Sequence, residues 1–337
     1  MWEKKQDKKL IKCFKMEKLL QLLPETKKDI LLAEYTTYKI GGPAKYFFVA
    51  KNKDDLLKAL EIAKKLKLQV FILGGGSNLL VSEKGFKGLV IKIEVSGMEV
   101  RANKIVAGAG IALSKLSTYA MENSLSGIEW SFGIPGATLG GSIYGCAQAF
   151  GEIISDNISN VEALDLKNFK IKNFTKDQCK FSLKSSIFKN PPAGGKNLII
   201  VSAVLSLRSE DKDKIKQKME EGMNYRKTNH PINFPSAGST FVNPEIKIKN
   251  KKLLEKYPEL VGFNEKGTIP AGYLIQKSGL QGKIIGGAQI SQMHANFIIN
   301  TGKAKAKDVL VLIKLAKQKV KKNFGIELQT EVQMLGF

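Results

Sequence analysis

The chain has 337 residues, of which 43% are hydrophobic and 25% are charged, and its formal net charge at pH 7 is +23. This composition is ordinary for a globular protein, and the length suffices for two or three domains. No apolar run approaches the ~20 residues that cross a bilayer, so we expect no membrane-spanning segment and no membrane partner.

The positive charge is spread along the whole chain as lysine. Arginine, which binds phosphates and base edges better than lysine does, occurs only at Arg101, Arg208 and Arg226. Dispersed lysines attract polyanionic substrates but make few simultaneous contacts to a nucleic-acid backbone. We therefore expect small-molecule substrates and no specific nucleic-acid partner.

Residues that bind metals or form disulfides are scarce. Three cysteines lie far apart, at Cys13, Cys146 and Cys179, and the chain has only two histidines, His230 and His294. No pair of cysteines has the C-x-x-C spacing. The pattern therefore predicts neither a disulfide framework nor a metal site.

Residues 1–26 are expected to form a basic N-terminal extension. Within them, Met1–Lys18 alternates lysines with apolar residues and lacks an apolar segment followed by a small-residue cleavage site. We interpret the segment as a frayed or helical extension, and we expect a cytoplasmic protein.

A βαβ unit leads into the first glycine-rich segment. Tyr46–Val49 is predicted to be a strand, a helix opens at Asp54 and Asp55, and Val70–Leu73 is predicted to be the next strand. The sequence Gly-Gly-Gly-Ser-Asn follows at once, over Gly74–Asn78. Glycines let the backbone approach a ligand closely, and successive N–H groups in such a turn can bind an anion such as a diphosphate. A turn that merely closes the βα unit is the alternative.

A second segment rich in small residues follows a predicted helix over Leu113–Asn123. It covers Gly127–Gly151, where so many small residues indicate close backbone packing against a neighbouring element or a flat ligand. Two such segments in one domain favour a large ligand over two structural turns.

The second half of the chain is predicted to begin with strands over Val161–Lys172 and Leu198–Leu207. A charged helix over Lys212–Arg226 marks a change of composition and a domain boundary. The last helix is predicted to open at Asp308 and to end at Gly325. The last strand, Ile326–Met334, is predicted to place Ile326, Leu328, Thr330, Val332 and Met334 on one face and Glu331 on the other.

Seven segments, in this order, resemble signatures of one family, the UDP-N-acetylenolpyruvoylglucosamine reductases, which are flavoenzymes of bacterial cell-wall precursor synthesis. The similarity extends from about Tyr35 to Gly336. The segments are YTTYKIGGPA (35–44), GGGSNLL (74–80), GIPGATLGG (133–141), PSAGSTFVNP (235–244), AGYLIQKSGL (271–280), HANFIIN (294–300) and TEVQMLG (330–336).

The resemblance implies an α+β protein with the vanillyl-alcohol-oxidase-type (PCMH-type) FAD-binding fold. Two FAD-binding subdomains are expected over residues 27–93 and 94–210. A substrate-binding α+β domain is expected over 211–337, with a last strand able to pack back on the FAD domain. We also expect a monomer.

The implied activity is that of an oxidoreductase, UDP-N-acetylmuramate dehydrogenase, which reduces the enolpyruvyl ether of UDP-N-acetylglucosamine-enolpyruvate to UDP-N-acetylmuramate. This step belongs to peptidoglycan synthesis, and so to cell-wall biogenesis, cell shape and cell division. FAD is the implied cofactor and NADPH the implied hydride donor. After hydride reaches the vinyl carbon, an acid must protonate the adjacent carbon while other groups stabilise the enolate.

Two residues match the catalytic positions of the family. Ser239 matches the proton-donating serine, and Glu331 matches the catalytic glutamate near the C-terminus. Without the family pattern, Ser239 is a typical turn former and Glu331 a typical solvated residue on the polar face of a strand.

By the same resemblance, Gly74–Asn78 holds the flavin diphosphate and Ile134–Gly141 packs along the flavin. Asn243 and His294 are expected to contact substrate, although turn formation or packing also explains either residue. The cofactor-binding residues that the resemblance implies are Gly41, Gly42, Gly74, Gly75, Gly76, Ser77, Asn78, Ile134, Pro135, Gly136, Gly140 and Gly141.

The chain departs from the family in two places. Leu183-Lys184 stands where the family has Tyr-Arg, so Lys184 is expected to hold the substrate carboxylate with an ammonium and without a planar fork. Within Gly145–Gly151, Cys146 and Gln148 stand where the family prefers smaller or different residues. The alternative is therefore a degenerate or substrate-altered protein that binds FAD or a sugar nucleotide on the same scaffold.

Overall fold

The computed structural model describes residues 17–191 and 198–337. Most of the predicted N-terminal extension, residues 1–16, lies outside the described residues. In the remainder of the extension, Leu19 and Leu23 are buried in a hydrophobic core.

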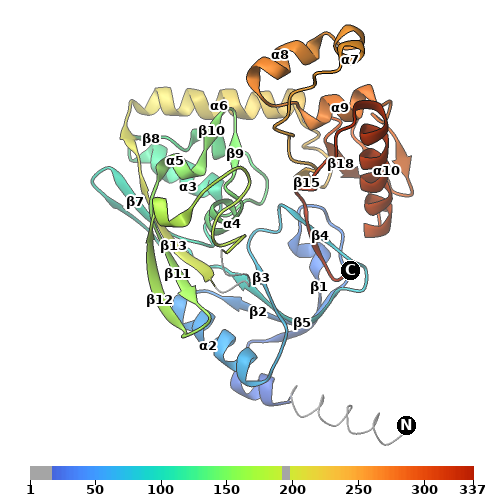
Figure 1. The fold of residues 1–337 in the computed structure, drawn as a ribbon. Coiled ribbons are helices and arrows are strands. Elements are labelled where there is room, and N and C mark those ends of the chain that lie inside the picture. Colours follow the sequence, from blue (N-terminus) through green and yellow to red (C-terminus); the bar gives the residue numbers. More distant parts are fainter. Residues whose placement is uncertain (1–16, 192–197) are drawn as a thin grey trace, which may run out of the picture. The chain divides into compact units, whose positions relative to one another are not determined.

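The described chain forms two compact units. Unit 1 contains the residues up to Leu31, together with Pro43–Gly75 and Phe86–Gly222, and unit 2 contains Leu32–Gly42, Gly76–Gly85 and Met223–Phe337. The boundary passes through the glycine-rich loop, between Gly75 and Gly76. Helix α6, Lys212–Asn229, runs through the second boundary (Figure 1).

Unit 1 contains a four-stranded sheet in the order β1-β2-β5-β3. Strands β2 and β3 both run parallel to β5, and α2 connects β2 to β3, as the predicted βαβ unit requires. Helix α2 begins after Asn52, whose side chain accepts a hydrogen bond from the N–H of Asp55 at 2.8 Å. The elements are β1 (Lys27–Leu31), β2 (Pro43–Ala50), α2 (Lys53–Lys65), β3 (Val70–Leu73) and β5 (Phe86–Ile93).

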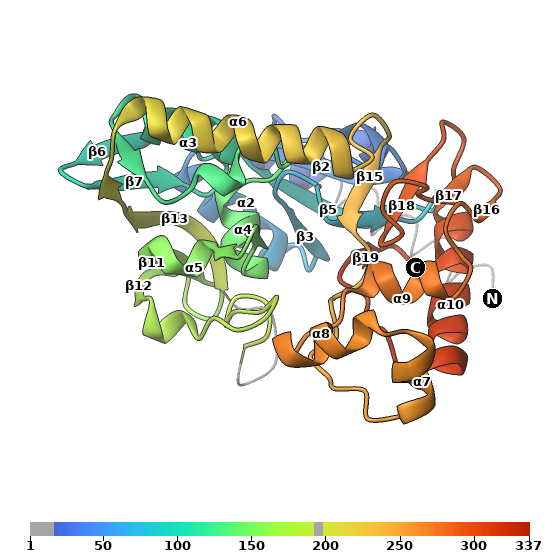
Figure 2. The same ribbon diagram turned by 90° about the horizontal axis from the view of Figure 1, so that it is seen from above.

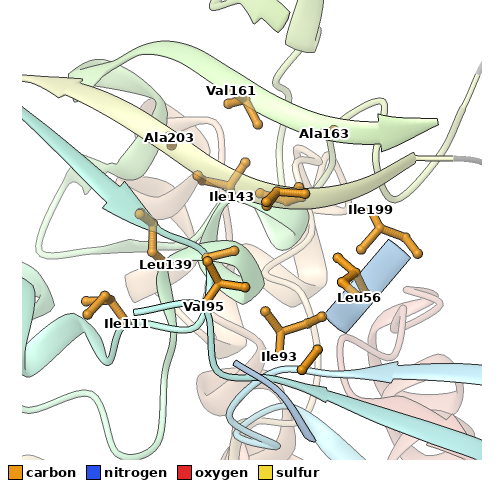
Figure 3. Close-up of a cluster of buried hydrophobic side chains, with 14 of the residues drawn as sticks. Leu56, Ile93, Val95, Ile111, Leu139, Ile143, Val161, Ala163, Ile199 and Ala203 are labelled. Atoms are coloured by element: carbon orange, nitrogen blue, oxygen red, sulfur yellow. The ribbon is translucent and has the colours of Figure 1, made fainter. Parts of the chain in front are cut away.

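The second sheet of unit 1 is antiparallel, in the order β12-β11-β13-β7-β6. Its core is mostly aliphatic, and Figure 3 shows Val161, Ala163 and Ala203 in the same buried cluster as Ile143 and Leu139. The sheet contains β6 (Met98–Arg101), β7 (Lys104–Gly108), β11 (Ile158–Asp165), β12 (Lys170–Thr175) and β13 (Leu198–Ser206).

The prediction of one strand over Val161–Lys172 is wrong. The chain reverses between β11 and β12, where the Asp165 carboxylate accepts a hydrogen bond from the N–H of Lys167 at 2.8 Å and the Asn168 side chain accepts one from the N–H of Lys170 at 3.1 Å. Asp and Asn stabilise turns through such local bonds, and the turn contains neither glycine nor proline to reveal it.

The remaining elements of unit 1 are short, apart from α3 (Leu113–Glu122), which confirms the helix predicted there. They are β8 (Leu125–Ser126), η2 (Glu129–Ser131), α4 (Leu139–Gly145), β9 (Gln148–Ala149), β10 (Glu152–Ile153), α5 (Ile154–Asn157), η3 (Asp177–Cys179) and β14 (Arg208–Ser209).

Unit 2 is built on a small sheet in the order β15-β18-β17-β16. Helix α10 packs along β16 and β17 (Figure 2). The elements are η1 (Leu32–Tyr35), β4 (Leu79–Val81), β15 (Ser236–Ser239), α7 (Lys251–Lys256), α8 (Glu259–Lys266), α9 (Ala271–Lys277), β16 (Ile284–Ile285), β17 (Ala288–Ile290), β18 (Phe297–Asn300), α10 (Ala306–Phe324) and β19 (Gln333–Leu335).

The C-terminal segment contains the predicted helix, which begins at Ala306 and not at Asp308, and it corrects the predicted strand. Helix α10 ends at Gly325, whose φ of +72° suits glycine. After it, only Gln333–Leu335 is a strand, paired in parallel with β4. Leu335 is buried and Met334 is 43% exposed, so the predicted alternation breaks before Met334.

Candidate functional site

The predicted site residues are divided between the two units, and the residues of each unit are described separately. Unit 1 contains Gly74, Gly75, Ile134, Pro135, Gly136, Gly140, Gly141 and Lys184. Unit 2 contains Gly41, Gly42, Gly76, Ser77, Asn78, Ser239, Asn243, His294 and Glu331.

The loop after β3 leaves a run of backbone donors available to a ligand. Among the hydrogen bonds of the described residues, none has the N–H group of Gly75, Gly76, Ser77 or Asn78 as its donor. The Asn78 side-chain Oδ1 is buried and accepts no hydrogen bond from the described chain. Buried polar groups require partners. Consecutive N–H donors beside a buried acceptor suit an anionic ligand that also carries hydroxyl groups, as a flavin dinucleotide does.

In unit 1, the loop lies directly against the second glycine-rich segment. A Cβ atom on Gly75 would overlap the carbonyl oxygen of Gly136. A Cβ on Gly74 would lie 2.9 Å from Thr138 Oγ1, and one on Gly141 would lie 3.2 Å from the same oxygen. The two glycine-rich segments predicted from the sequence are therefore brought together in unit 1, at a spacing that side chains on Gly74 and Gly75 would prevent.

Thr138 organises this contact and was missed in the sequence. It is the N-cap of α4, and its hydroxyl accepts a hydrogen bond from the N–H of Gly141 at 3.4 Å. The backbone on both sides of Thr138 is also fixed, because the Ala137 carbonyl accepts a hydrogen bond from the N–H of Leu113 and the N–H of Leu139 donates one to the carbonyl of Ile111, both at 2.9 Å. A threonine immediately before a helical segment is the ordinary N-cap signal, so the sequence did contain the clue.

Lys184 lies in a strained turn of unit 1. Ser182 and Ser185 exchange two backbone hydrogen bonds, at 3.1 and 3.0 Å, around Leu183 and Lys184. Lys184 has φ +53°, a conformation that costs about 1–2 kcal/mol for a residue with a side chain. Lys189 Nζ donates to the Lys184 carbonyl at 2.7 Å and holds this turn.

The charge of Lys184 acts on the end of helix α4. Cys146 caps α4 at its C-terminus with φ +46°. Burial raises the pKa of its thiol, while Ser155 and the Lys184 ammonium lower that pKa in smaller part. The first turn of the same helix contains Gly140 and Gly141, so Lys184 acts at the far end of the element that carries part of the second glycine-rich segment.

The two residues that replace the family pattern after α4 have structural places. Cys146 is a buried free thiol in a left-handed cap, and Gln148 lies in β9, which pairs with β10.

In unit 2, Ser239 follows a bulge at the end of β15. Ser236 pairs with Ile299 and Ser239 pairs with Phe297, so the intervening residues of β15 outnumber those of β18 by one. Gly238 within the bulge has φ +73°. The bulge rotates the end of the strand and so determines where the Ser239 hydroxyl points.

The backbone of Glu331 is hydrogen-bonded to the residue that follows Ser239 and to the glycine-rich loop. Its N–H donates to the carbonyl of Thr240, next to Ser239, at 2.9 Å. Its carbonyl accepts a hydrogen bond from Asn78 Nδ2 at 3.2 Å, and the N–H of Gln333 donates to the carbonyl of Asn78 at 3.1 Å. Unit 2 therefore brings Ser239, Glu331 and Asn78 into one hydrogen-bonded framework.

Thr37, a second residue missed in the sequence, belongs to the same framework. Its N–H donates to the carbonyl of Gly76 at 3.2 Å, and its hydroxyl donates to the carbonyl of Ser236 at 2.7 Å. Gly41 and Gly42 lie close by in sequence, and the N–H of Gly42 donates to Ser82 at 2.9 Å. These bonds join the loop to β15 across a large sequence separation, which local patterns do not reveal.

Asn243 and His294 both make structural contacts. Asn243 Oδ1 accepts a hydrogen bond from the N–H of Ala271 at the start of α9, at 2.9 Å. His294 Nδ1 accepts one from the N–H of Asn296 at 3.2 Å, and burial lowers the pKa of the ring. Their predicted substrate contacts stay predictions.

The two histidines form an aromatic cluster. The rings of His230 and His294 are 5.5 Å apart, and His230 also contacts Tyr225 and Phe297 at 5.9 and 5.2 Å between ring centroids. Burial, and in smaller part the nearby positive charges of His294 and Arg226, lower the pKa of His230 from 6.5 to about 4.

We expect His230→Gln to make the protein less sensitive to acid. Because the folded pKa lies below the unfolded one, the native state binds fewer protons between pH 6.5 and 4, and stability falls as the pH drops through this window. At pH 5 the shift corresponds to about 2 kcal/mol, and we expect about half of this because the ring is partly exposed. Urea unfolding at pH 7 and pH 5 measures the difference. An equal loss of stability in the variant and the wild type contradicts the prediction.

Two negative findings concern the described residues alone. No helix of residues 17–191 and 198–337 is long and apolar enough to cross a membrane. The same residues contain no cluster of three or more histidine, cysteine, aspartate or glutamate side chains able to hold a metal ion.

Comparisons with known proteins give consistent matches for both parts of the chain. Residues 230–335 match the family profile described as UDP-N-acetylenolpyruvoylglucosamine reductase, C-terminal domain, and residues 44–172 match a profile described as FAD binding domain. The UDP-N-acetylenolpyruvoylglucosamine reductase of Caldanaerobacter subterraneus subsp. tengcongensis is 38% identical over 324 residues, which cover 95% of this chain and 98% of the relative.

Two further matches agree with these. UDP-N-acetylenolpyruvoylglucosamine reductase 1 of Bacillus anthracis is 39% identical over 310 residues, which cover 91% of this chain and 94% of the relative. The crystal structure of UDP-N-acetylenolpyruvylglucosamine reductase from Thermus caldophilus superposes with a TM-score of 0.71 at 28% identity, covering 92% of this chain and 98% of that chain. The predicted fold, an FAD-binding fold with a further α+β domain, is thereby confirmed.

Proposed function

Since the chain belongs to the UDP-N-acetylenolpyruvoylglucosamine reductase family, we infer that it is an FAD-dependent oxidoreductase that reduces the enolpyruvyl ether of UDP-N-acetylglucosamine-enolpyruvate in peptidoglycan precursor synthesis. The observation that carries this conclusion is the 38% identity over 98% of a relative with that name. The FAD-binding match over residues 44–172 supports the cofactor independently.

The first test is optical. We expect the purified protein to be yellow, to be bleached by NADPH without oxygen, and to recover its colour when the enolpyruvyl substrate is added. Denaturation should release all the flavin, because neither Gly74–Asn78 nor Ile134–Gly141 contains a histidine for a covalent link. A colourless protein that cannot be reconstituted with FAD contradicts the proposal.

We assign cofactor binding to the two glycine-rich segments. The N–H groups of Gly75, Gly76, Ser77 and Asn78 would bind the diphosphate, and the buried Asn78 Oδ1 would accept from a hydroxyl group of the flavin side chain. Ile134–Gly141 would pack along the flavin. Gly41 and Gly42 would be the remaining cofactor-binding residues. When bound, FAD would supply the hydride-transfer chemistry between NADPH and the vinyl carbon of the substrate.

The remaining chemistry falls to side chains of this chain. Hydride addition places negative charge on the carbon next to the ether, delocalised into the carboxylate. Ser239 would give its hydroxyl proton to that carbon, and Glu331 would act in the same step. Lys184 would hold the carboxylate with a charge-assisted hydrogen bond. Asn243 and His294 would contact the substrate.

The second candidate function is binding of FAD or a sugar nucleotide without turnover. The observation that favours it is Leu183-Lys184, where Leu183 replaces a hydroxyl-bearing residue and is 39% exposed. The optical test separates the two, because a binding protein takes up flavin but does not reoxidise with the enolpyruvyl substrate.

We propose that the protein acts in the cytoplasm as a monomer without a specific nucleic-acid partner. Cys146 and Cys179 are free, buried thiols, as expected in a reducing compartment. Light scattering tests the monomer. Tight, sequence-selective DNA binding at physiological salt would contradict the third part of this proposal, because dispersed lysines support only weak binding that salt abolishes.

A further inference from the structure

Asn296 forms hydrogen bonds with the backbone that follows Ser239. Its side chain is 3% exposed and pairs with both polar groups of the Phe241 peptide. Asn296 Oδ1 accepts a hydrogen bond from the N–H of Phe241 at 3.0 Å, and Asn296 Nδ2 donates one to the Phe241 carbonyl at 2.9 Å. The N–H of Thr240 donates to the Asn296 carbonyl at 2.7 Å. Three hydrogen bonds from one residue thus fix Thr240 and Phe241.

These bonds continue the β15–β18 ladder beyond its last regular pair. The ladder ends where Ser239 pairs with Phe297, because β18 begins at Phe297. Beyond that pair, the side-chain amide of Asn296 supplies the hydrogen-bond partners that the backbone of Phe241 does not find in β18. Ser239 is therefore held between the ladder on one side and the Asn296 amide on the other, directly after a bulge that could shift in register.

Thr240 and Phe241 also connect to Glu331 and its neighbour Thr330. The Thr240 carbonyl accepts the N–H of Glu331 at 2.9 Å, and Phe241 forms an isolated bridge with Thr330. Displacement of Thr240–Phe241 would therefore move the backbone next to Ser239 and the backbone of Glu331 together.

We propose that Asn296 is a positioning residue for the reaction, which sets the orientation of the Ser239 hydroxyl through Thr240 and Phe241. This inference rests on the proposed function, in which Ser239 donates the proton. A small displacement of a donor slows proton transfer because the reacting atoms must meet at hydrogen-bonding distance. Asn296 itself would touch neither substrate nor flavin.

The chain contains a matched control for this amide. Asn264 grips Ile248 in the same way, with Oδ1 accepting from the Ile248 N–H at 2.9 Å and Nδ2 donating to its carbonyl at 2.8 Å. Both asparagines belong to unit 2, but Ile248 lies outside the segments that carry the predicted site. Removal of either amide deletes an equivalent pair of side-chain-to-backbone hydrogen bonds. Only the pair made by Asn296 lies next to Ser239.

The test compares Asn296→Ala with Asn264→Ala in the flavin-loaded enzyme. Asn296→Ser and Asn264→Ser form a second pair with a milder substitution at the same two positions. We expect Asn296→Ala to slow single-turnover reoxidation by the enolpyruvyl substrate about tenfold, with flavin reduction by NADPH and substrate affinity unchanged. Asn264→Ala should leave both half-reactions unchanged, whatever its loss of thermal stability. An unchanged reoxidation rate in both Asn296 variants, or equal slowing in the Asn264 variants, overturns the inference.

Ser239→Ala and the double variant separate this inference from the function on which it rests. If Asn296 acts through Ser239, adding Asn296→Ala to Ser239→Ala slows reoxidation no further. Full additivity of the two effects overturns the positioning role while Ser239 keeps its own. A wild-type rate for Ser239→Ala instead removes the proton-donor assignment.

Discussion

Ser239→Ala is expected to slow reoxidation of the reduced flavin by the enolpyruvyl substrate about a hundred- to ten-thousandfold, the usual contribution of a positioned general acid. Reduction of the flavin by NADPH should stay near the wild-type rate, because that step needs no proton at the substrate carbon. Rapid-mixing absorbance under anaerobic conditions measures the two half-reactions separately.

The matched control is Ser236→Ala, at the other end of β15. Ser236 is the same residue type in the same strand, and within residues 17–191 and 198–337 its hydroxyl takes part in one hydrogen bond, a long one of 3.5 Å that it accepts from the N–H of Gly238. It should leave both half-reactions unchanged. A Ser239→Ala enzyme that reoxidises as fast as the Ser236→Ala enzyme would reduce Ser239 to a turn residue.

Glu331→Gln belongs to the same comparison. The substitution keeps the size of the side chain and removes its charge, while the backbone bonds from Glu331 to Thr240 and Asn78 can persist. Only the second half-reaction should slow. Slowing of flavin reduction as well would place Glu331 near the NADPH step.

The sequence predicted best those elements whose signals are local. Helix α2 has an Asn cap, two aspartates in its first turn and apolar positions at helical spacing, and it forms as predicted. Helix α10 ends at Gly325, again as predicted. In each case the deciding residues lie within one helical turn of the boundary that they determine.

The elements that failed depend on partners far away in the chain. Which of Met334 and Leu335 is buried is decided by parallel pairing of β19 with β4, where Leu335 lies opposite Val81. The alternation that begins at Ile326 contains no information about that partner. The turn between β11 and β12 failed for another reason, since its side chains hydrogen-bond locally without glycine or proline.

In the candidate site, too, residues with a local sequence signal were predicted and residues that act on distant partners were not. Gly74–Asn78 and the longer segment Gly127–Gly151 were identified from their composition, Ile134–Gly141 within the latter was singled out by the family resemblance, and the structure explains Gly75 by its contact with Gly136. The supporting residues Thr37 and Asn296 were not identified, because each holds its target through hydrogen bonds across 199 and 55 positions of sequence. Single-sequence patterns describe neighbours on one element and do not reveal such pairs.

Lys184→Ala is expected to slow reoxidation by the substrate about ten- to a hundredfold, with little effect on reduction by NADPH. The loss of a hydrogen bond to a charged group costs about 1.5–3 kcal/mol, which corresponds to that range of rates. Lys184→Arg should retain the rate or raise it, because the guanidinium can form two parallel bonds to a carboxylate.

Lys180→Ala is the control for both the charge and the backbone. Lys180 lies four residues earlier, carries the same side chain and also has a left-handed backbone, with φ +44° against +53° for Lys184. Both alanine variants keep a residue with a Cβ in this conformation, so any backbone strain is equal. Only the Lys184 variant removes the cation that acts on Cys146 at the end of α4.

The left-handed conformation gives a further reason to expect function at Lys184. Glycine or asparagine is the ordinary choice for the third residue of a turn with positive φ, and strain of this kind gathers at functional sites because the surrounding structure must maintain it. Lys184→Gly relieves the strain and removes the ammonium together, so it should stabilise the turn while slowing reoxidation as much as Lys184→Ala does. If the glycine variant reoxidises at the wild-type rate, Lys184 is one solvated lysine among many in this chain, and the carboxylate must be held by another residue.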